Sequence, residues 1–204
     1  MKNSSRRIGR TLWVAVRSML VLTVVLGVGY TLLVTGIGQI ALPHQAHGSL
    51  VSDAQGRTVG SALIGQSFVD GRGDPLPQYF QSRPSAAGEG YDAAASAGSN
   101  LGPENDTLVS AVRDRRARIA VFDRVDPGLV PADALTASAS GLDPDISPAY
   151  AAIQVDRVAA ARGLPAATVA DLVRRATRPR ALGFIGEPRV NVVELNLGLD
   201  GPEG

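Results

Sequence analysis

The sequence predicts an α+β protein in which one N-terminal transmembrane helix is followed by a single soluble α+β domain. Residues 18–42 carry no charged side chain. As a helix they would extend roughly 37 Å, past a hydrocarbon core of about 30 Å. The chain after them, about 160 residues, is long enough for one domain with its own core. Because no regular βαβ repeat follows, we expect a basic N-terminus over 1–11, a transmembrane helix over 12–42 and the domain over 43–204.

The charges that flank the apolar run predict its orientation. Arg57 is the only Lys or Arg in the twenty residues after the run, whereas five basic residues lie in or before it: Lys2, Arg6, Arg7, Arg10 and Arg17. Positive charge stays on the cytoplasmic side, so we expect a single-pass protein of the cell (plasma or inner) membrane with an extracytoplasmic domain. A cleaved signal peptide is the alternative, but its apolar region is typically about 7 to 15 residues long. Residues 40–45 also lack a small-x-small cleavage site.

Small residues recur within the apolar run at a spacing of four, at Gly27, Thr31 and Thr35. Such spacing lets two helix backbones approach closely, so these residues are candidates for helix packing. The alternative is that Gly and Thr are ordinary constituents of membrane helices. One helix cannot form a transport pathway, so a transport function would require partner subunits besides the lipid bilayer.

The composition excludes several kinds of chemistry. There is no Cys, and Lys2 is the only lysine, so thiolate sites and a lysine-containing phosphate loop are absent. Only His44 and His47 could serve a hydrolase relay or a metal site, and a polar collar at the membrane surface is the favoured interpretation. After the span, 15 basic and 19 acidic residues give −4, which does not suit nucleic acid. We expect no catalytic residue, no metal site and no independent enzyme.

The domain begins with a predicted hairpin and a loop-rich stretch. Residues 48–52 and 58–64 are β-type runs joined by a short turn. Residues 65–105 are rich in Gly, Pro, Ser and Ala, yet they hold four of the eight Phe and Tyr residues of the chain. Because disordered segments are poor in aromatics, we favour an ordered loop fixed to the core by its rings. These are Phe68, Tyr79, Phe80 and Tyr91.

A first helix is predicted to begin at Asn105 or Asp106, which are good N-caps, and to run to about Arg118. Its arginines, at 113, 115, 116 and 118, are expected at the helix end, where cations complement the helix dipole. An anionic partner for them is the alternative. Asn105 also matches the N-glycosylation pattern, but capping is its favoured role.

Two further helices and a strand complete the predicted domain. Ser147 and Pro148 are typical of a helix start, and Gly163 is placed to end that helix. A second helix follows Pro165 and stops before Pro179. Apolar residues then alternate with polar ones over 193–199, which favours a half-buried strand near the C-terminus.

Six motifs follow one another along the chain: PHQAHGSL (43–50), GSALIGQSF (60–68), YFQSRPS (79–85), SNLGP (99–103), LTASASGLDP (135–144) and GEPRVNV (186–192). In this order they resemble those of the C subunits of Kdp potassium-transporting ATPases, and the resemblance covers the chain from the span to Asp200. Residues 88–97 are less typical of the family.

The resemblance implies a non-catalytic subunit of a high-affinity, ATP-driven potassium importer. Its implied partners are a channel-like potassium-binding subunit, a P-type ATPase subunit and a small hydrophobic subunit. Subunits of this family are described as catalytic chaperones that raise the ATP affinity of the hydrolytic subunit, with no tightly bound cofactor. The implied nucleotide-binding residues are Gln154 and, in a segment similar to the nucleotide-associated motif of ABC transporters, Ser138, Ser140 and Gly141.

The predicted topology opposes a direct contact with ATP, because ATP is cytoplasmic and the charges place Gln154 outside. We therefore favour a solvent-facing or partner-facing Gln154 and a domain that lies over the potassium entrance of the channel-like subunit. There it would support assembly and shape ion access. A membrane-anchored binding or assembly module unrelated to transport is the alternative function.

Overall fold

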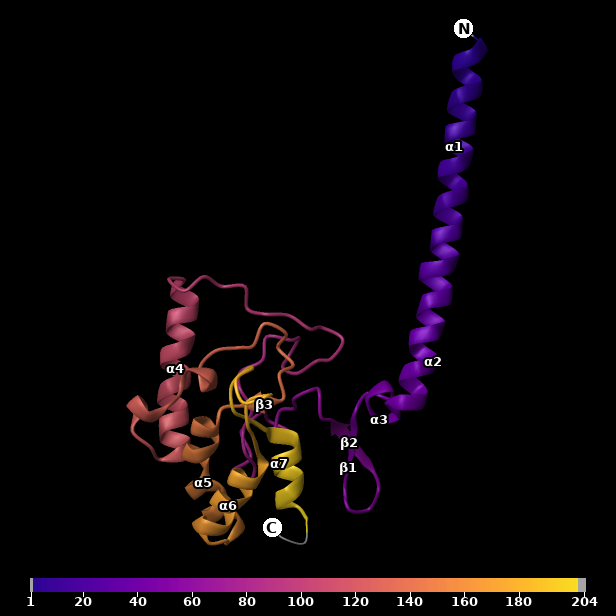
Figure 1. Cartoon of the computed structure of the whole chain (residues 1–204). Helices are drawn as coiled ribbons and strands as arrows, with labels where there is room; N and C mark the ends of the chain where they lie inside the picture. Colours follow the sequence, from indigo (N-terminus) through magenta and orange to yellow (C-terminus); the bar gives the residue numbers. More distant parts are fainter. Residues whose placement is uncertain (1, 202–204) are drawn as a thin grey trace. The chain divides into compact units, whose positions relative to one another are not determined.

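The computed structural model describes residues 2–201, and their side chains from residue 8 onward. The chain divides into two compact units, Met1–Ser49 and Leu50–Gly204. The first is helical, and the second combines helices with two small antiparallel sheets (Figure 1). The predicted α+β class, with one long apolar helix before the domain, is confirmed.

The first unit is a nearly continuous helix. It consists of α1 (Lys2–Leu22), the π-helical η1 (Thr23–Tyr30) and α2 (Thr31–Ala41), and the short α3 (Pro43–Ala46) follows. Its part Ile8–Ala41 has 34 residues and contains an 18-residue window with a mean hydropathy of 2.2, so it is long and apolar enough to cross a membrane.

The candidate packing residues lie in two different helical geometries. Gly27 belongs to the π-helical η1, whereas Thr31 and Thr35 belong to α2. The sequence pattern did not distinguish these geometries. No described side chain of the span is buried within the chain, so its apolar surface is left for lipid or for a partner helix.

The second unit begins with the expected hairpin. Strands β1 (Leu50–Ser52) and β2 (Thr58–Ser61) pair antiparallel. The turn between them is closed by Asp53, whose Oδ1 accepts hydrogen bonds from the backbone N–H groups of Gln55 at 3.0 Å and Arg57 at 2.8 Å. This hairpin is confirmed.

The aromatic residues fix the long connection between β2 and α4 to the core, as predicted. Phe80 is fully buried, and the rings of Phe68 and Tyr79 are 5.5 Å apart. Tyr91 donates a hydrogen bond from its hydroxyl to the Arg83 carbonyl at 2.8 Å. The connection is therefore an ordered part of the domain.

Helix α4 (Asp106–Asp123) begins at the predicted cap, because the side-chain oxygen Oδ1 of Asn105 accepts a hydrogen bond from Thr107 N at 2.9 Å. The helix continues past Arg118 to Asp123 and ends at Arg124 in the left-handed conformation. The prediction that the arginine run occupies its last turn is therefore wrong. A turn of apolar residues, including the buried Ala120, carries the helix onward into the core.

Two short 3₁₀ turns, η2 (Pro127–Leu129) and η3 (Ala132–Ala134), lead to the next helices, α5 (Pro148–Arg162) and α6 (Ala166–Ala176). Their predicted boundaries are confirmed. The Ser147 hydroxyl caps α5 by accepting from Tyr150 N at 3.0 Å, and Gly163 ends it with φ +67°. Only residues without a Cβ adopt that conformation at little cost.

The second sheet has the order β3–β5–β4, and all pairs are antiparallel. Its strands are β3 (Asp145–Ile146), β4 (Thr177–Arg178) and β5 (Arg189–Asn191). The buried Ile146 and Val190 face each other in the β3–β5 register. The core of the unit lies between this sheet and the faces of α5, α6 and α7 (Val192–Leu199).

The predicted C-terminal strand over 193–199 is wrong, because these residues form helix α7 (Val192–Leu199). The side chain of Asn191 caps this helix by accepting from Glu194 N at 3.1 Å. The buried side chains recur at helical spacing: Val192, Val193, Leu195, Asn196 and Leu199. The predicted alternation treated Asn196 as a solvent-facing residue. In the helix Asn196 is buried, so the alternation of apolar and polar residues did not reflect a strand.

Candidate functional site

The segment 79–85, here called the clamped segment, links the residues that the sequence singled out. Two side-chain amides hold its backbone. Asn196 of α7 accepts from Phe80 N at 2.8 Å and donates to Phe80 O at 3.0 Å. Gln154 of α5 accepts from Gln81 N at 2.6 Å and donates to Gln81 O at 3.2 Å. Each amide thus pairs with the backbone N–H and C=O of one residue, as a neighbouring strand would do in a sheet.

Gln154 is fully buried, so the expectation of a solvent-facing or partner-facing residue is wrong. Its Nε2 also donates to Tyr150 O at 3.3 Å, and its Oε1 accepts from Nη2 of Arg157 at 2.7 Å. The amide is satisfied within the domain. An amide at this position supplies both the donor and the acceptor that a buried peptide group needs.

Arg157 connects the clamped segment to α4. Its Nε donates to Oδ1 of Asp123 at 2.6 Å, and only 6% and 2% of the two side chains are exposed. Its Nη1 donates to the carbonyls of Pro77 and Tyr79 at 2.6 and 2.9 Å. The guanidinium also lies 4.4 Å from the Phe122 ring centroid. A buried charge is stable only with such partners.

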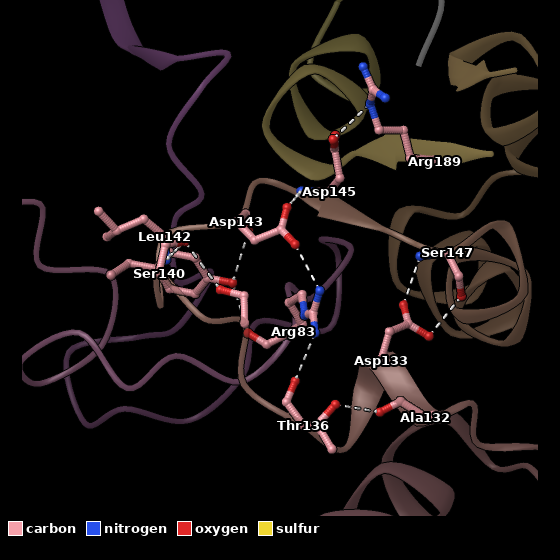
Figure 2. A network of polar contacts seen from close by, with 12 residues as sticks. Arg83, Ala132, Asp133, Thr136, Ser140, Leu142, Asp143, Asp145, Ser147 and Arg189 are labelled. Atoms are coloured by element: carbon pink, nitrogen blue, oxygen red, sulfur yellow. Dashed lines mark hydrogen bonds and ion pairs between the residues drawn. The ribbon is translucent and has the colours of Figure 1, made fainter. Parts of the chain in front are cut away.

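Arg83, in the same segment, organises a second network (Figure 2). It donates through Nη1 to Oδ2 of Asp143 at 2.8 Å and through Nη2 to the Thr136 carbonyl at 3.3 Å. The other oxygen of Asp143 accepts from Asp145 N at 3.0 Å. Nearby, Asp133 binds both the backbone N–H and the hydroxyl of Ser147, at 2.7 and 2.9 Å. The network fixes the loop 136–143 against β3 and the start of α5.

The remaining residues predicted to bind nucleotide lie together in that loop. The hydroxyls of Ser138 and Ser140 are 3.4 Å apart, and Ser140 Oγ accepts from Leu142 N at 3.1 Å. The carbonyl of Gly141 accepts from Ser85 Oγ at 2.6 Å. The structure therefore brings the loop to one end of the clamped segment, whereas Gln154 holds its other end.

Gly141 is needed for close packing. Its φ is +68°, and an added Cβ would lie 2.6 Å from Ala97 O and 2.7 Å from Ala87 N. Because both neighbours are backbone atoms, a side chain could be accommodated only by moving the loops. A packing requirement thus explains the glycine of this motif.

A cavity of about 540 Å³ opens beside the Arg83 network. Its charged lining residues are Arg83, Asp133, Asp143, Asp145, Glu187 and Arg189. Four carboxylates face two guanidiniums in this lining, and Arg180, which pairs with Glu187, adds a third cation at its edge. An excess of one negative charge remains, and it raises the local concentration of cations. Among the described residues, no group of three His, Cys, Asp or Glu side chains is placed to hold a metal ion.

Asp145 lines this cavity, and its carboxylate is only partly paired. Its Oδ2 forms an ion pair with Arg189 Nε at 2.9 Å, while its Oδ1 is buried and finds no hydrogen-bond partner among the described residues. Burial raises the pKa of the Asp145 carboxyl, and the nearby Arg189 charge opposes this. The folded protein therefore binds this proton more tightly than the unfolded chain does.

Replacing Asp145 with asparagine is expected to flatten part of the pH dependence of stability. Since the folded-state pKa is the higher one, this group makes the wild-type free energy of unfolding fall as the pH rises from the unfolded pKa through the folded pKa. D145N cannot titrate, so it should lose less stability than the wild type between about pH 4 and 7. Urea unfolding across this range measures the difference. The exposed D74N is the control, and equal pH slopes for D145N and wild type would refute the prediction.

Two of the arginines of α4 line a second cavity, of about 360 Å³. Arg115 and Arg118 line it together with Phe122, Tyr150 and the clamped-segment residue Gln81. Burial lowers the pKa of Arg115, and the neighbouring charge of Arg118 adds to this. The interpretation of the arginine run as a site for an anionic partner stays a prediction.

Sequence reasoning missed the residues that hold the clamped segment: Asp123, Arg157 and Asn196. Their partners are 34 to 116 positions away in the chain, so no local pattern reveals the contacts. One signal was present for Asn196, which stands at a core position of a helical apolar pattern. A polar residue at such a position indicates a specific buried hydrogen bond.

Comparison with known proteins identifies relatives along nearly the whole chain. The family model described as "KdpC: K+-transporting ATPase, c chain" matches residues 12–201. A potassium-transporting ATPase KdpC subunit of Caulobacter vibrioides is 53% identical over 187 residues, covering 91% of this chain and 90% of the relative. The corresponding subunit of Gemmatimonas aurantiaca is 56% identical over 180 residues, covering 88% and 86%. That of Kineococcus radiotolerans is 55% identical over 181 residues, covering 89% and 88%.

Proposed function

This chain belongs to the KdpC family of K⁺-transporting ATPase c chains and is an accessory subunit of a potassium-transport complex; we propose that its domain works outside the cytoplasm, where it supports assembly and shapes potassium access. Membership in the family removes the alternative of a module unrelated to transport. We further propose that the chain has no catalytic residue of its own and that ATP reaches it only through the complex.

The distribution of charge around the helix Ile8–Ala41 carries this proposal. Four basic residues precede residue 12, whereas the domain after the span carries 15 basic and 19 acidic residues. The positive-inside rule then assigns the N-terminus to the cytoplasm and the domain to the opposite side. Potassium enters an importer from that side.

The burial of Gln154 supports a function of the domain that does not involve direct contact with ATP. Its amide already makes four hydrogen bonds inside the domain and is fully buried. A nucleotide contact would require those bonds to break and the clamped segment to leave its place. The predicted nucleotide-binding role of Gln154, Ser138, Ser140 and Gly141 therefore stays secondary in this proposal.

The acidic cavity beside Arg83 supports an effect on cation access. Its four carboxylates, from Asp133, Asp143, Asp145 and Glu187, outnumber by one the arginines that line the cavity or pair with them. This excess attracts cations by the field of the site. This effect needs no tight site, because potassium must be released again to a transport pathway. We propose that the channel-like potassium-binding subunit provides that pathway below the domain.

The span supports assembly in the same proposal. All its described side chains are open to the surroundings, and Gly27, Thr31 and Thr35 offer positions where a second helix could approach closely. We propose that this face packs against a helix of the channel-like subunit. The P-type ATPase subunit and the small hydrophobic subunit are the other proposed partners.

A single-cysteine experiment tests the location of the domain. The natural chain contains no Cys, and Ala152 is exposed on α5, two residues before Gln154. A152C, produced with the other subunits, is expected to react with a membrane-impermeant maleimide in intact cells. S5C, in the basic N-terminus, is the matched control and should react only after lysis.

The opposite labelling pattern would reverse the orientation. If A152C reacts only after lysis while S5C reacts in intact cells, the domain is cytoplasmic. The catalytic-chaperone function would then be the better explanation, because ATP would share a compartment with Gln154.

A further inference from the structure

Three large apolar side chains are exposed at the turn in the middle of the loop that connects β4 to β5. The exposed fractions are 82% for Leu182, 73% for Phe184 and 52% for Ile185. We call these three residues the apolar tip. Single exposed apolar residues are ordinary on a protein surface, but a cluster that includes an aromatic ring is typical of an interaction site.

The apolar tip is held in shape and is not a loose loop. Ala181 and Ile185 exchange two backbone hydrogen bonds of 2.9 Å. Between them, Leu182 has φ +52° and Gly183 has φ +83°. A leucine rarely adopts the left-handed conformation, and strained backbone of this kind is concentrated at binding and functional sites.

The charges of the connection are neutralised within the chain. Arg180 pairs with Glu187 at 2.5 Å, Arg178 pairs with Glu194 at 2.5 Å, and Arg189 pairs with Asp145 at 2.9 Å. A segment that binds anionic lipid usually presents unpaired basic residues beside its apolar ones. Here the arginines are already paired with carboxylates, so the apolar tip suits an uncharged pocket on a protein.

We propose that the apolar tip inserts into an apolar pocket on the extracytoplasmic surface of the channel-like potassium-binding subunit, over which the proposed function places the domain. This rests on the proposed function, since it requires the domain to be outside the cytoplasm. Phe184 is the anchor, because a rigid ring buries a large apolar area at a small cost in conformational entropy. The two backbone hydrogen bonds between Ala181 and Ile185 keep the ring presented before binding, which reduces the entropy lost on docking.

Photo-crosslinking identifies the occupant of the surface. A benzophenone side chain replaces Phe184 in the full chain, produced with the other subunits and irradiated in the membrane. A crosslink to the channel-like subunit is the expected result. The same group in place of Val121, which is 79% exposed on α4, is the matched control. Crosslinks only to lipid, or equal protein crosslinks from both positions, would overturn the proposal.

A triple serine variant, L182S/F184S/I185S, gives the energetic test. It should keep the wild-type unfolding transition, because the apolar tip does not belong to the core. The amount of co-purified partner subunits should fall about tenfold or more after a dilution wash in mild detergent. The control V121S/L129S, which changes two other exposed apolar residues, should retain them.

The outcomes separate the two proposals. If wild type co-purifies with the transport subunits and the tip variant does so equally well, only the apolar-tip proposal fails. If wild type itself recovers no transport subunit, or if A152C labels only after lysis, the proposed function fails first.

Discussion

Replacement of Arg157 by alanine is expected to lower the free energy of unfolding of the domain by about 3–5 kcal/mol. The change leaves Asp123 as a buried carboxylate, 2% exposed, without its cation. It also removes the donors to Pro77 O and Tyr79 O. Breaking one partner of a buried ion pair costs far more than the pair itself contributes, because the remaining charge stays desolvated.

Denaturant unfolding of the full chain in mild detergent, followed by circular dichroism, measures this loss. R116A, which removes an exposed arginine of α4, is the control and should change stability by less than about 0.5 kcal/mol. Asp123→Asn combined with Arg157→Met should recover part of the loss, since neither variant residue carries a charge. A loss below about 1 kcal/mol in R157A would show that Arg157 is not the connection between α4, α5 and the clamped segment.

Gly141→Ala is the second large effect, with an expected cost of about 2–5 kcal/mol from left-handed backbone strain and overpacking together. The new Cβ would lie 2.6 and 2.7 Å from two backbone atoms, Ala97 O and Ala87 N. Neither neighbour is the flexible end of a side chain, so the loops 136–143 and 85–97 would have to separate. Thermal or urea unfolding of the full chain reports the loss.

The control for this prediction is Gly102→Ala, in the same loop-rich part of the domain. An added Cβ there meets nothing within 4 Å, and the stability should be nearly unchanged. If G141A unfolds like the wild type but alters the dependence of ATP hydrolysis by the whole complex on ATP concentration, the packing explanation of Gly141 is wrong. The nucleotide interpretation of the motif would then gain support.

Local rules predicted the elements whose boundaries depend on single residues. Ser147, Pro148 and Gly163 define α5 through capping and a left-handed end, and Asn105 defines the start of α4. These effects operate within four residues, so the sequence contains them in full. The hairpin β1–β2 was predictable for the same reason, since Asp53 closes its own turn.

Periodicity failed where a core position is polar. Over 193–199, counting only apolar residues gave an alternation typical of a strand. The helix buries Asn196 beside Leu195 and Leu199, and Asn191 supplies the cap. The buried Asn196 donates a hydrogen bond to Phe80, which lies 116 residues earlier, so its place in the core depends on a distant partner. No window of the sequence contains both residues.

The candidate site was predictable only as a set of motifs. The resemblance indicated Ser138, Ser140, Gly141 and Gln154, but not that the clamped segment lies between the loop and Gln154. Nor did it indicate that Gln154 is buried, although its neighbours on both sides in helix α5 are apolar. A glutamine in an amphipathic pattern ordinarily marks the solvated face, and here the long-range partner Gln81 reverses that expectation.

The amide clamp also sets an order of events during synthesis. Phe80 emerges from the ribosome 116 residues ahead of Asn196, which corresponds to about 6 to 23 s at the usual rates of elongation. Over that interval the backbone N–H and C=O of Phe80 have no permanent partner, and the neighbouring loop cannot dock. Final closure of the domain therefore waits for its last helix, so the nascent chain presents an open, loop-rich intermediate while its N-terminal anchor is already available to the membrane.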